Sequence, residues 1–205
     1  NFTGQTLTDT VYTTASPMSR RFEERIDASF HDVVDVWDSD RWHDGVGTVL
    51  PEEMTDAGVE PHDRYPNKRH IVHFMQPHYP FIGSDIDDHA RTFGEGDGEA
   101  DFWRLQFRNQ IDEAESAVWA AYRDNFDQTM PAIERLVESI DGHVVVMSDH
   151  GNLIGERVGL FPIKEWGHPR GIYVEPLVRV PWLVCQTDPR RTIHESTPVE
   201  QEVDD

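Results

Sequence analysis

Asp149 and His150 stand side by side after an apolar run, His143–Met147, and a single serine. A carboxylate oxygen beside an imidazole nitrogen suits Zn²⁺, Mn²⁺ or a similar divalent ion. Gly151 would let the backbone turn sharply away, so that both side chains can point at one ion. Because ligands gather at the carboxyl ends of strands in parallel α/β sheets, we predict that Asp149 and His150 bind a metal. The alternative is a polar turn in which His150 is merely hydrogen-bonded.

A second candidate is His78, which lies in the segment HFMQPHYPF (73–81) between two prolines and just past a predicted strand. A histidine held on such a stiff loop suits the positioning of a substrate, and the alternative is an exposed loop histidine. Eight other histidines have no comparable context and are interpreted as loop or structural residues: His31, His43, His62, His70, His73, His89, His143 and His194.

The order of these motifs resembles a known family. The predicted strand runs into SDHG and is followed by GE, a lysine, GH and VPWLV, while PHYP lies upstream. This order resembles the C-terminal portion of the alkaline phosphatase superfamily, in its sulfatase-like branch, and is nearest in look to sulfatase-like hydrolases of salt-loving archaea. The resemblance covers about residues 43–185 and is most specific at 70–81 and 143–184.

The resemblance implies a role for each matching residue. Asp149 and His150 match the ligands of a divalent metal ion, which could be Ca²⁺, Mn²⁺, Zn²⁺ or Mg²⁺. His78 matches a histidine that touches the sulfate or phosphate group or the leaving oxygen, and Lys164 stands about where the branch places an anion-contacting lysine. His168 matches a histidine that binds a second metal or contacts substrate. Lys164 is equally compatible with an ordinary surface lysine.

The implied activity is that of a metal-dependent hydrolase of sulfate esters. A phosphatase, phosphodiesterase or phosphotransferase on the same scaffold is the first alternative, mildly favoured because His150 stands where many sulfatases carry Asn. A non-catalytic binding module of the same fold is the second. In either enzyme the substrate is an anionic sulfate or phosphate ester.

The nucleophile that this family requires is missing from its expected motif. The segment ASPMSR (15–20) is similar to the sulfatase nucleophile motif, but Ala15 occupies the nucleophile position and Arg20 lies one residue too late. Cys185 has no Pro or Arg in register. We therefore expect the chain to be a fragment, inactive alone, whose nucleophile and remaining acidic metal ligand lie upstream of Asn1.

The elements that must position these residues can be read from the hydrophobic pattern. Strands are predicted at 9–15, 70–75, 143–148 and 180–185, and a short helix begins at Pro51. Apolar residues from Phe107 to Ala121 recur on one face of a predicted helix. Pro131 is expected to interrupt this helix, and a second helix is predicted to end at Ile140. Residues 18–47 are predicted to be loop with short helix, and 83–100 an exposed loop.

These elements predict the fold class and the domain organisation. Strand–helix–strand alternation favours an α/β fold, a three-layer α/β/α arrangement with a mainly parallel sheet. Through the resemblance it is alkaline-phosphatase-like and incomplete at its N-terminus. Strands 70–75, 143–148 and 180–185 are expected to share one sheet. Residues 1–185 form part of a single domain, and 186–205 a polar, frayed tail.

The charge balance restricts the partners. The chain has 39 Asp and Glu against 18 Lys and Arg, a formal net charge of -21, and only two lysines. Acid excess spread over the whole sequence indicates a halophilic protein, because concentrated salt screens the self-repulsion. Nucleic acid and anionic membrane surfaces are poor partners for this field. The sequence contains no apolar stretch of membrane-spanning length and no visible signal peptide, so we expect a cytoplasmic protein without a transmembrane segment.

The charge yields a first test. At 0.01 M salt, unscreened repulsion acts over roughly 30 Å, which spans most of a domain of this size. We expect circular dichroism across a KCl series to show loss of structure at millimolar salt and recovery at molar salt. An unchanged melting temperature across the series would contradict the halophilic interpretation.

Overall fold

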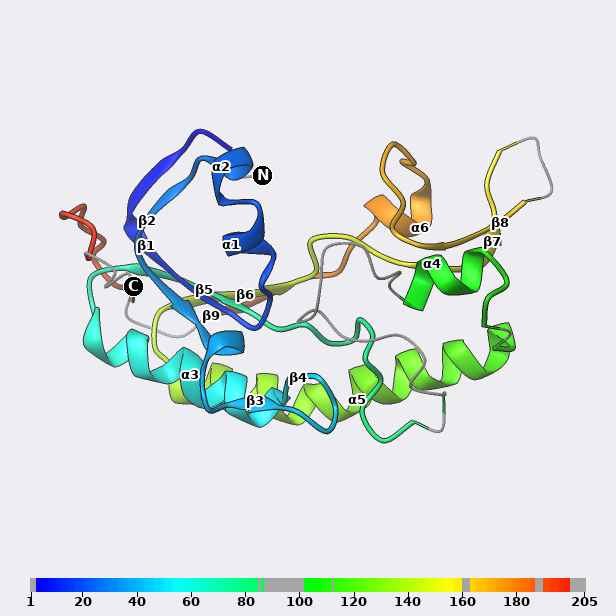
Figure 1. The fold of residues 1–205 in the computed structure, drawn as a ribbon. Helices are drawn as coiled ribbons and strands as arrows, with labels where there is room; N and C mark the ends of the chain where they lie inside the picture. Colours follow the sequence, from blue (N-terminus) through cyan, green and yellow to red (C-terminus); the bar gives the residue numbers. More distant parts are fainter. Residues whose placement is uncertain are drawn as a thin grey trace.

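The chain folds into a mixed α/β structure, described by a computed structural model for residues 3–84, 86, 102–111, 113–159, 163–186 and 190–199. Figure 1 shows a three-stranded parallel sheet with helices beside it at one end and short strands and helices at the other. The long helix α5 (Glu115–Ser139) extends beneath both. The parallel sheet flanked by helices confirms the expected α/β class, while the alkaline-phosphatase-like three-layer arrangement stays a prediction.

The parallel sheet has the strand order β2–β1–β5, with β1 at Thr6–Thr14, β2 at Ser29–Asp35 and β5 at Arg69–His73. The central Thr14 is in register with the last residues of both neighbouring strands. The three strands therefore end at one edge, where their loops can deliver side chains to a common place. Two exposed helical turns, α1 (Met18–Arg21) and α2 (Glu23–Ile26), connect β1 to β2.

One core lies between this sheet and helix α3 (Pro51–Arg64). The turn η1 (Val36–Asp38) and the two-residue strands β3 (Trp42–His43) and β4 (Thr48–Val49) lead into the helix. The helix begins at Pro51 as predicted, because Pro is tolerated where the amide is not needed for the ladder. The buried members of this core are Ala15, Val36, Val49, Met54 and Ala57.

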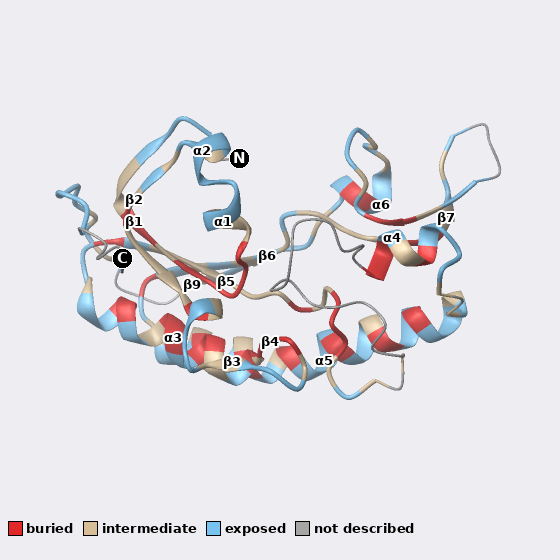
Figure 2. Ribbon diagram, viewed as in Figure 1, coloured by how far each residue is buried: buried red, intermediate tan, exposed pale blue. Residues whose placement is uncertain are grey.

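A second core lies at the other end of α5. It is formed with α4 (Phe102–Phe107), β7 (Leu153–Arg157) and β8 (Lys164–Gly167), and the short helix α6 (Glu175–Val178) lies nearby. Its buried members are Tyr79, Phe81, Phe102, Trp103, Val118, Ala121, Ile154 and Trp166. Figure 2 shows buried positions recurring along α5, which thus joins both cores.

The expectation that strands 70–75, 143–148 and 180–185 share one sheet is wrong. Strand β6 (His143–Met147) pairs antiparallel with β9 (Trp182–Gln186), and in the described residues this pair is a sheet separate from β5. Side chains of β6 alternate between half-buried and exposed, whereas burial on both faces was expected. An apolar run predicts that a strand exists, but it specifies neither its partner nor its direction.

Further strands escaped the sequence pattern. The segment 18–47, predicted as loop with short helix, contains the whole of β2 as an edge of the parallel sheet. Aspartates within SFHDVVD break the apolar alternation that would have predicted a strand. An edge strand tolerates such polar side chains. The hairpin β7–β8, which carries the residues after the metal motif, was also not predicted.

The helical region departs from prediction in two places. Between α4 and α5 the side chain of Gln106 bonds both the N–H and the carbonyl of Glu113, which replaces helical hydrogen bonds and separates the two helices. Conversely, Pro131 does not interrupt α5. A proline inside a helix costs about 3 kcal/mol, and the buried Ala132 and Leu136 beyond it supply packing that offsets this cost.

Residues 190–199 of the predicted polar tail form backbone hydrogen bonds with the rest of the chain. The amide of His194 donates to the carbonyl of Asn67 at 2.9 Å, and that of Ser196 donates to the carbonyl of Thr8 at 3.3 Å. Backbone partners on the sheet and its entry loop hold this segment in place. The rest of the tail, most of the predicted 83–100 loop and His89 lie outside the described residues.

In the part of the chain that the structure describes, no helix is both long and apolar enough to cross a membrane.

The loop that carries His78 is anchored to α5 by one buried side chain, Asn125, which is 0% exposed. Its amide N–H groups donate to the carbonyls of His78 at 3.0 Å and Pro80 at 3.2 Å, and its oxygen accepts the amide of Ile82 at 3.1 Å. Asn125 thereby provides a hydrogen-bond partner for three backbone groups of this loop.

We expect Asn125→Ala to lower the free energy of unfolding by about 2–4 kcal/mol, because it removes three hydrogen bonds from a buried side chain to the loop backbone. The matched control is Gln128→Ala, on the same helix, whose exposed side chain donates to the carbonyl of Ile82. The control should cost less than about 0.5 kcal/mol. Urea unfolding at fixed salt measures both, and equal effects would contradict the anchoring role.

Candidate functional site

Asp149 and His150 follow β6 directly and present one oxygen and one nitrogen side by side. Asp149 Oδ1 lies 3.7 Å from His150 Nε2. The other ring nitrogen, Nδ1, lies 3.0 Å from the carbonyl oxygen of Gly151 and must carry the hydrogen, since a carbonyl only accepts. In the neutral ring Nε2 is then the lone-pair nitrogen, which is the form that binds a metal.

Gly151 permits this arrangement because the backbone of α6 lies against it. Its amide donates to the carbonyl of Leu177 at 3.0 Å. A Cβ at this position would lie 2.0 Å from the carbonyl oxygen of Pro176, far inside van der Waals contact. A side chain here would push α6 away or turn the segment that holds His150.

His168 follows β8 and lies against His150, with ring centroids 4.2 Å apart and the rings tilted by 38°. Its Nε2 lies 3.4 Å from Nε2 of His78. The last residue of β8, Gly167, has a φ of +69° and packs under Trp103, where a Cβ would lie 2.7 Å from Cγ of the indole. The glycine therefore sets the direction in which the chain leaves β8.

His78 is held from both ring nitrogens. Nδ1 lies 2.7 Å from the carbonyl oxygen of Tyr79 and therefore donates, while Nε2 accepts the indole N–H of the buried Trp103 at 3.0 Å. These two bonds specify a neutral ring with its hydrogen on Nδ1. His150 and His78 thus share one design, in which a backbone carbonyl takes Nδ1–H and Nε2 lies toward the neighbouring side chain of the site.

The structure brings four of the predicted residues together. Asp149, His150, His168 and His78 form a continuous row of contacts. They come from the ends of β6 and β8 and from the loop after β5, although these strands belong to three different sheets.

His73, interpreted from the sequence as structural, belongs to the same neighbourhood. It ends β5, and its Nδ1 lies 2.7 Å from the hydroxyl of Tyr12 on β1. Burial lowers the pKa of His73, the carboxylate of Asp149 opposes that shift, and His150 adds to it. A histidine at the last position of a strand that feeds the site was the signal in the sequence.

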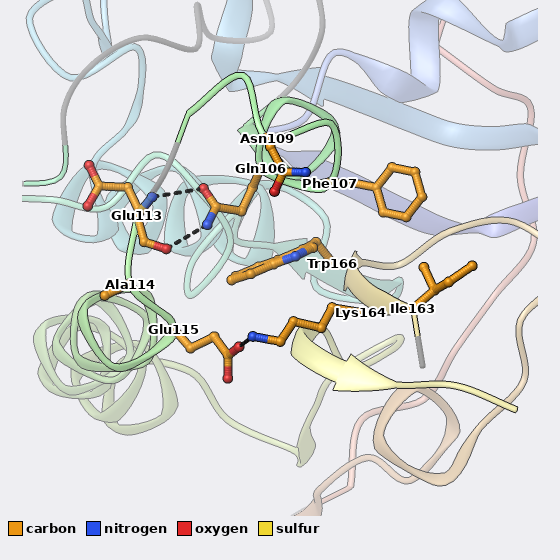
Figure 3. Close-up of a pocket in the computed structure, with 9 residues that line it drawn as sticks. All are labelled: Gln106, Phe107, Asn109, Glu113, Ala114, Glu115, Ile163, Lys164 and Trp166. Atoms are coloured by element: carbon orange, nitrogen blue, oxygen red, sulfur yellow. Dashed lines mark hydrogen bonds and ion pairs between the residues drawn. The ribbon is translucent and has the colours of Figure 1, made fainter. Parts of the chain in front are cut away.

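Lys164 is not part of the row. It begins β8, four residues before His168, which at about 3.3 Å per residue places their backbones roughly 13 Å apart. Its ammonium pairs with the carboxylate of Glu115 at the mouth of a cavity of about 420 Å³, which Trp166 also lines (Figure 3). Lys164 and Trp166 are two residues apart in β8 and therefore lie on the same face of the strand.

The donors fit part of a metal site. Asp149 and His150 supply an oxygen and a nitrogen of the types that Zn²⁺ or Mn²⁺ accepts. Within the described ranges, no three His, Cys, Asp or Glu side chains are placed to hold a metal ion together. A catalytic site normally has three or more protein ligands, so at least one would have to come from elsewhere or move in.

The close approach at Gly151 gives a test of the local packing. We expect Gly151→Ala to lower the free energy of unfolding by about 1–3 kcal/mol, because the methyl group meets backbone that cannot rotate away. Gly45→Ala is the control, since its Cβ meets only the side chain of exposed His43 at 3.2 Å. Thermal unfolding compares the two, and a Gly151→Ala protein as stable as the control would exclude the tight contact.

Comparison with known proteins identifies no relative of this chain. No family model, curated protein or solved structure matches the chain. What can be said of the site therefore rests on the described residues and on physical chemistry.

Proposed function

We propose that the protein is a metal-dependent hydrolase of sulfate esters, belonging to the sulfatase-like branch of the alkaline phosphatase superfamily with its three-layer α/β/α fold. The observation that carries the proposal is the row Asp149–His150–His168–His78. Two of its imidazoles have their Nδ1–H on a backbone carbonyl, which leaves Nε2 as the lone-pair nitrogen. Such anchoring fixes ring orientation before any ligand arrives.

In this proposal Asp149 and His150 hold a divalent ion. The ion, when bound, would polarise the ester oxygens and lower the pKa of the attacking group. His150 needs no rearrangement to bind the ion, because its Nδ1–H already donates to the carbonyl of Gly151 and its Nε2 carries the lone pair. Asp149 has a side chain that is 70% exposed, so its carboxylate is accessible to an ion from solvent.

His168 and His78 would face the ester anion beside the ion. His168 is exposed and its ring lies against that of His150, so an anion bound beside one ring would also contact the other. His78 is held more rigidly, by Asn125 through its backbone and by Trp103 through its ring. We assign to His168 the binding of the anion or the service of the leaving oxygen. His78 would position the anion only after its Nε2 parts from the indole of Trp103 and gains a hydrogen, because both ring nitrogens are otherwise engaged.

Lys164 takes a different place in the proposal. With its ammonium paired to Glu115 and about 13 Å along β8 from His168, it would contact a distal part of the substrate rather than the reacting group. The nucleophile and a further acidic ligand would come from outside the described residues. Ser16, the serine closest to the expected motif, instead accepts the amide of Met18 in a local turn.

Phosphate esters are the alternative substrate, and His150 is the residue that favours them. An imidazole is a neutral donor of the kind found in many phosphoryl-transfer metal sites, whereas the sulfatase pattern often has Asn there. The ratio of turnover on an aryl phosphate to that on an aryl sulfate separates the two chemistries. Turnover of neither, with metal bound, would favour a binding module.

The decisive change is Asp149→Ala. We expect these 205 residues to bind Zn²⁺ or Mn²⁺ weakly and without turnover, and Asp149→Ala to abolish the binding with the fold intact, because a two-donor site loses half its ligands. In a protein that also supplies the nucleophile, the same change should abolish aryl-ester turnover.

The control is Asp124→Ala, which removes one exposed carboxylate from α5. Calorimetry measures metal binding, circular dichroism the fold and release of the aryl alcohol the turnover. If the Asp149→Ala protein binds metal with the affinity of the control, the proposed metal site is contradicted, whatever the activity of the variant.

A further inference from the structure

Lys68 is a buried cation whose ammonium is bonded to neutral groups. It lies just before β5 and is 7% exposed. Its ammonium donates to the carbonyl of Thr8 at 2.8 Å, the carbonyl of His194 at 2.9 Å and the hydroxyl of Ser196 at 2.6 Å. Among the described residues, none of the ion pairs includes Lys68. Burying a charge is costly unless an opposite charge compensates it.

A cavity of about 290 Å³ opens beside this ammonium. Its lining includes His31, Arg64, Asn67, Lys68, His194 and Ser196, and no described lining residue is acidic. In a chain with 39 acidic against 18 basic residues, a cavity lined by two permanent cations and two histidines is a local reversal of the field. The low-dielectric surroundings of Lys68 strengthen that field inside the cavity.

We propose that this cavity is a binding site for a small inorganic oxyanion such as phosphate or sulfate. Lys68 supplies charge without hydrogen bonds, because its three N–H groups are already used. Arg64 is exposed and supplies a planar fork that matches an oxyanion, and the amide of Asn67 adds a neutral donor.

The site lies at the opposite edge of the sheet from the histidine row. Lys68 precedes β5 and Thr8 lies near the start of β1, whereas His73 and the row lie at the carboxyl ends of the strands. One wall is the segment 190–199, through His194 and Ser196. An anion bound here therefore links the C-terminal segment to the sheet and is independent of the proposed hydrolase activity.

The test is a titration of the ¹⁵N-labelled protein with potassium phosphate at constant ionic strength, maintained with KCl. We expect saturable shifts of the backbone amides of Asn67, Lys68, His194 and Ser196. Constant ionic strength removes screening as a cause, and saturation separates a site from the general stabilisation that phosphate gives by exclusion from the surface. Sulfate should compete for the same site.

Arg64→Gln removes the exposed donor without opening the core, and should weaken phosphate binding about tenfold or more. The control is Arg179→Gln, which makes the same substitution at a distant arginine. Arg179 follows α6 and pairs with Glu175, so this variant should bind phosphate as the unsubstituted protein does. Lys68→Met should abolish binding, and folding of that variant is checked by circular dichroism. Linear, unsaturated shifts in the unsubstituted protein, or unchanged affinity in Arg64→Gln, would overturn the proposal.

Discussion

The geometry of the candidate site depends on one buried amide in the middle of α5. Asn125 can donate twice and accept twice, and three of those capacities are spent on the backbone between His78 and Ile82. Because α5 reaches both cores, this side chain ties the loop that follows the parallel sheet to the helix that supports the β7–β8 hairpin. Loss of the tie would release His78 relative to His168, which arrives from that hairpin.

The site is assembled by backbone groups more than by side-chain pairs. Carbonyl oxygens fix the rings of His78 and His150, and glycines at 151 and 167 allow the chain to pass close to α6 and Trp103. Backbone partners hold ring orientation without adding charge, which leaves the electrostatic character of the site to Asp149 and to whatever ligand it receives. This arrangement suits a site where a divalent metal ion and an ester anion would bind side by side.

Local features of the sequence predicted the strands at 70–75 and 143–148 and the start of a helix at Pro51, because strand runs and helix starts are local signals. Strand pairing was not predictable, because β6 could pair with β5 or β9 with similar side-chain patterns. His73 was missed because its hydrogen-bond partner, Tyr12, is sixty-one residues away in sequence and adjacent only in the sheet.

The bond from Trp103 to His78 has a consequence for the movement of protons. Nε2 of His78 accepts the indole N–H, so the same nitrogen cannot also carry a hydrogen while that bond lasts. To act as an acid, the imidazole must first part from the indole, and Trp103 is wedged against Gly167 in a close-packed core. Proton delivery from His78 would then require a side-chain rearrangement in α4 and β8, which makes its rate a property of the packing around a tryptophan and not of the imidazole alone.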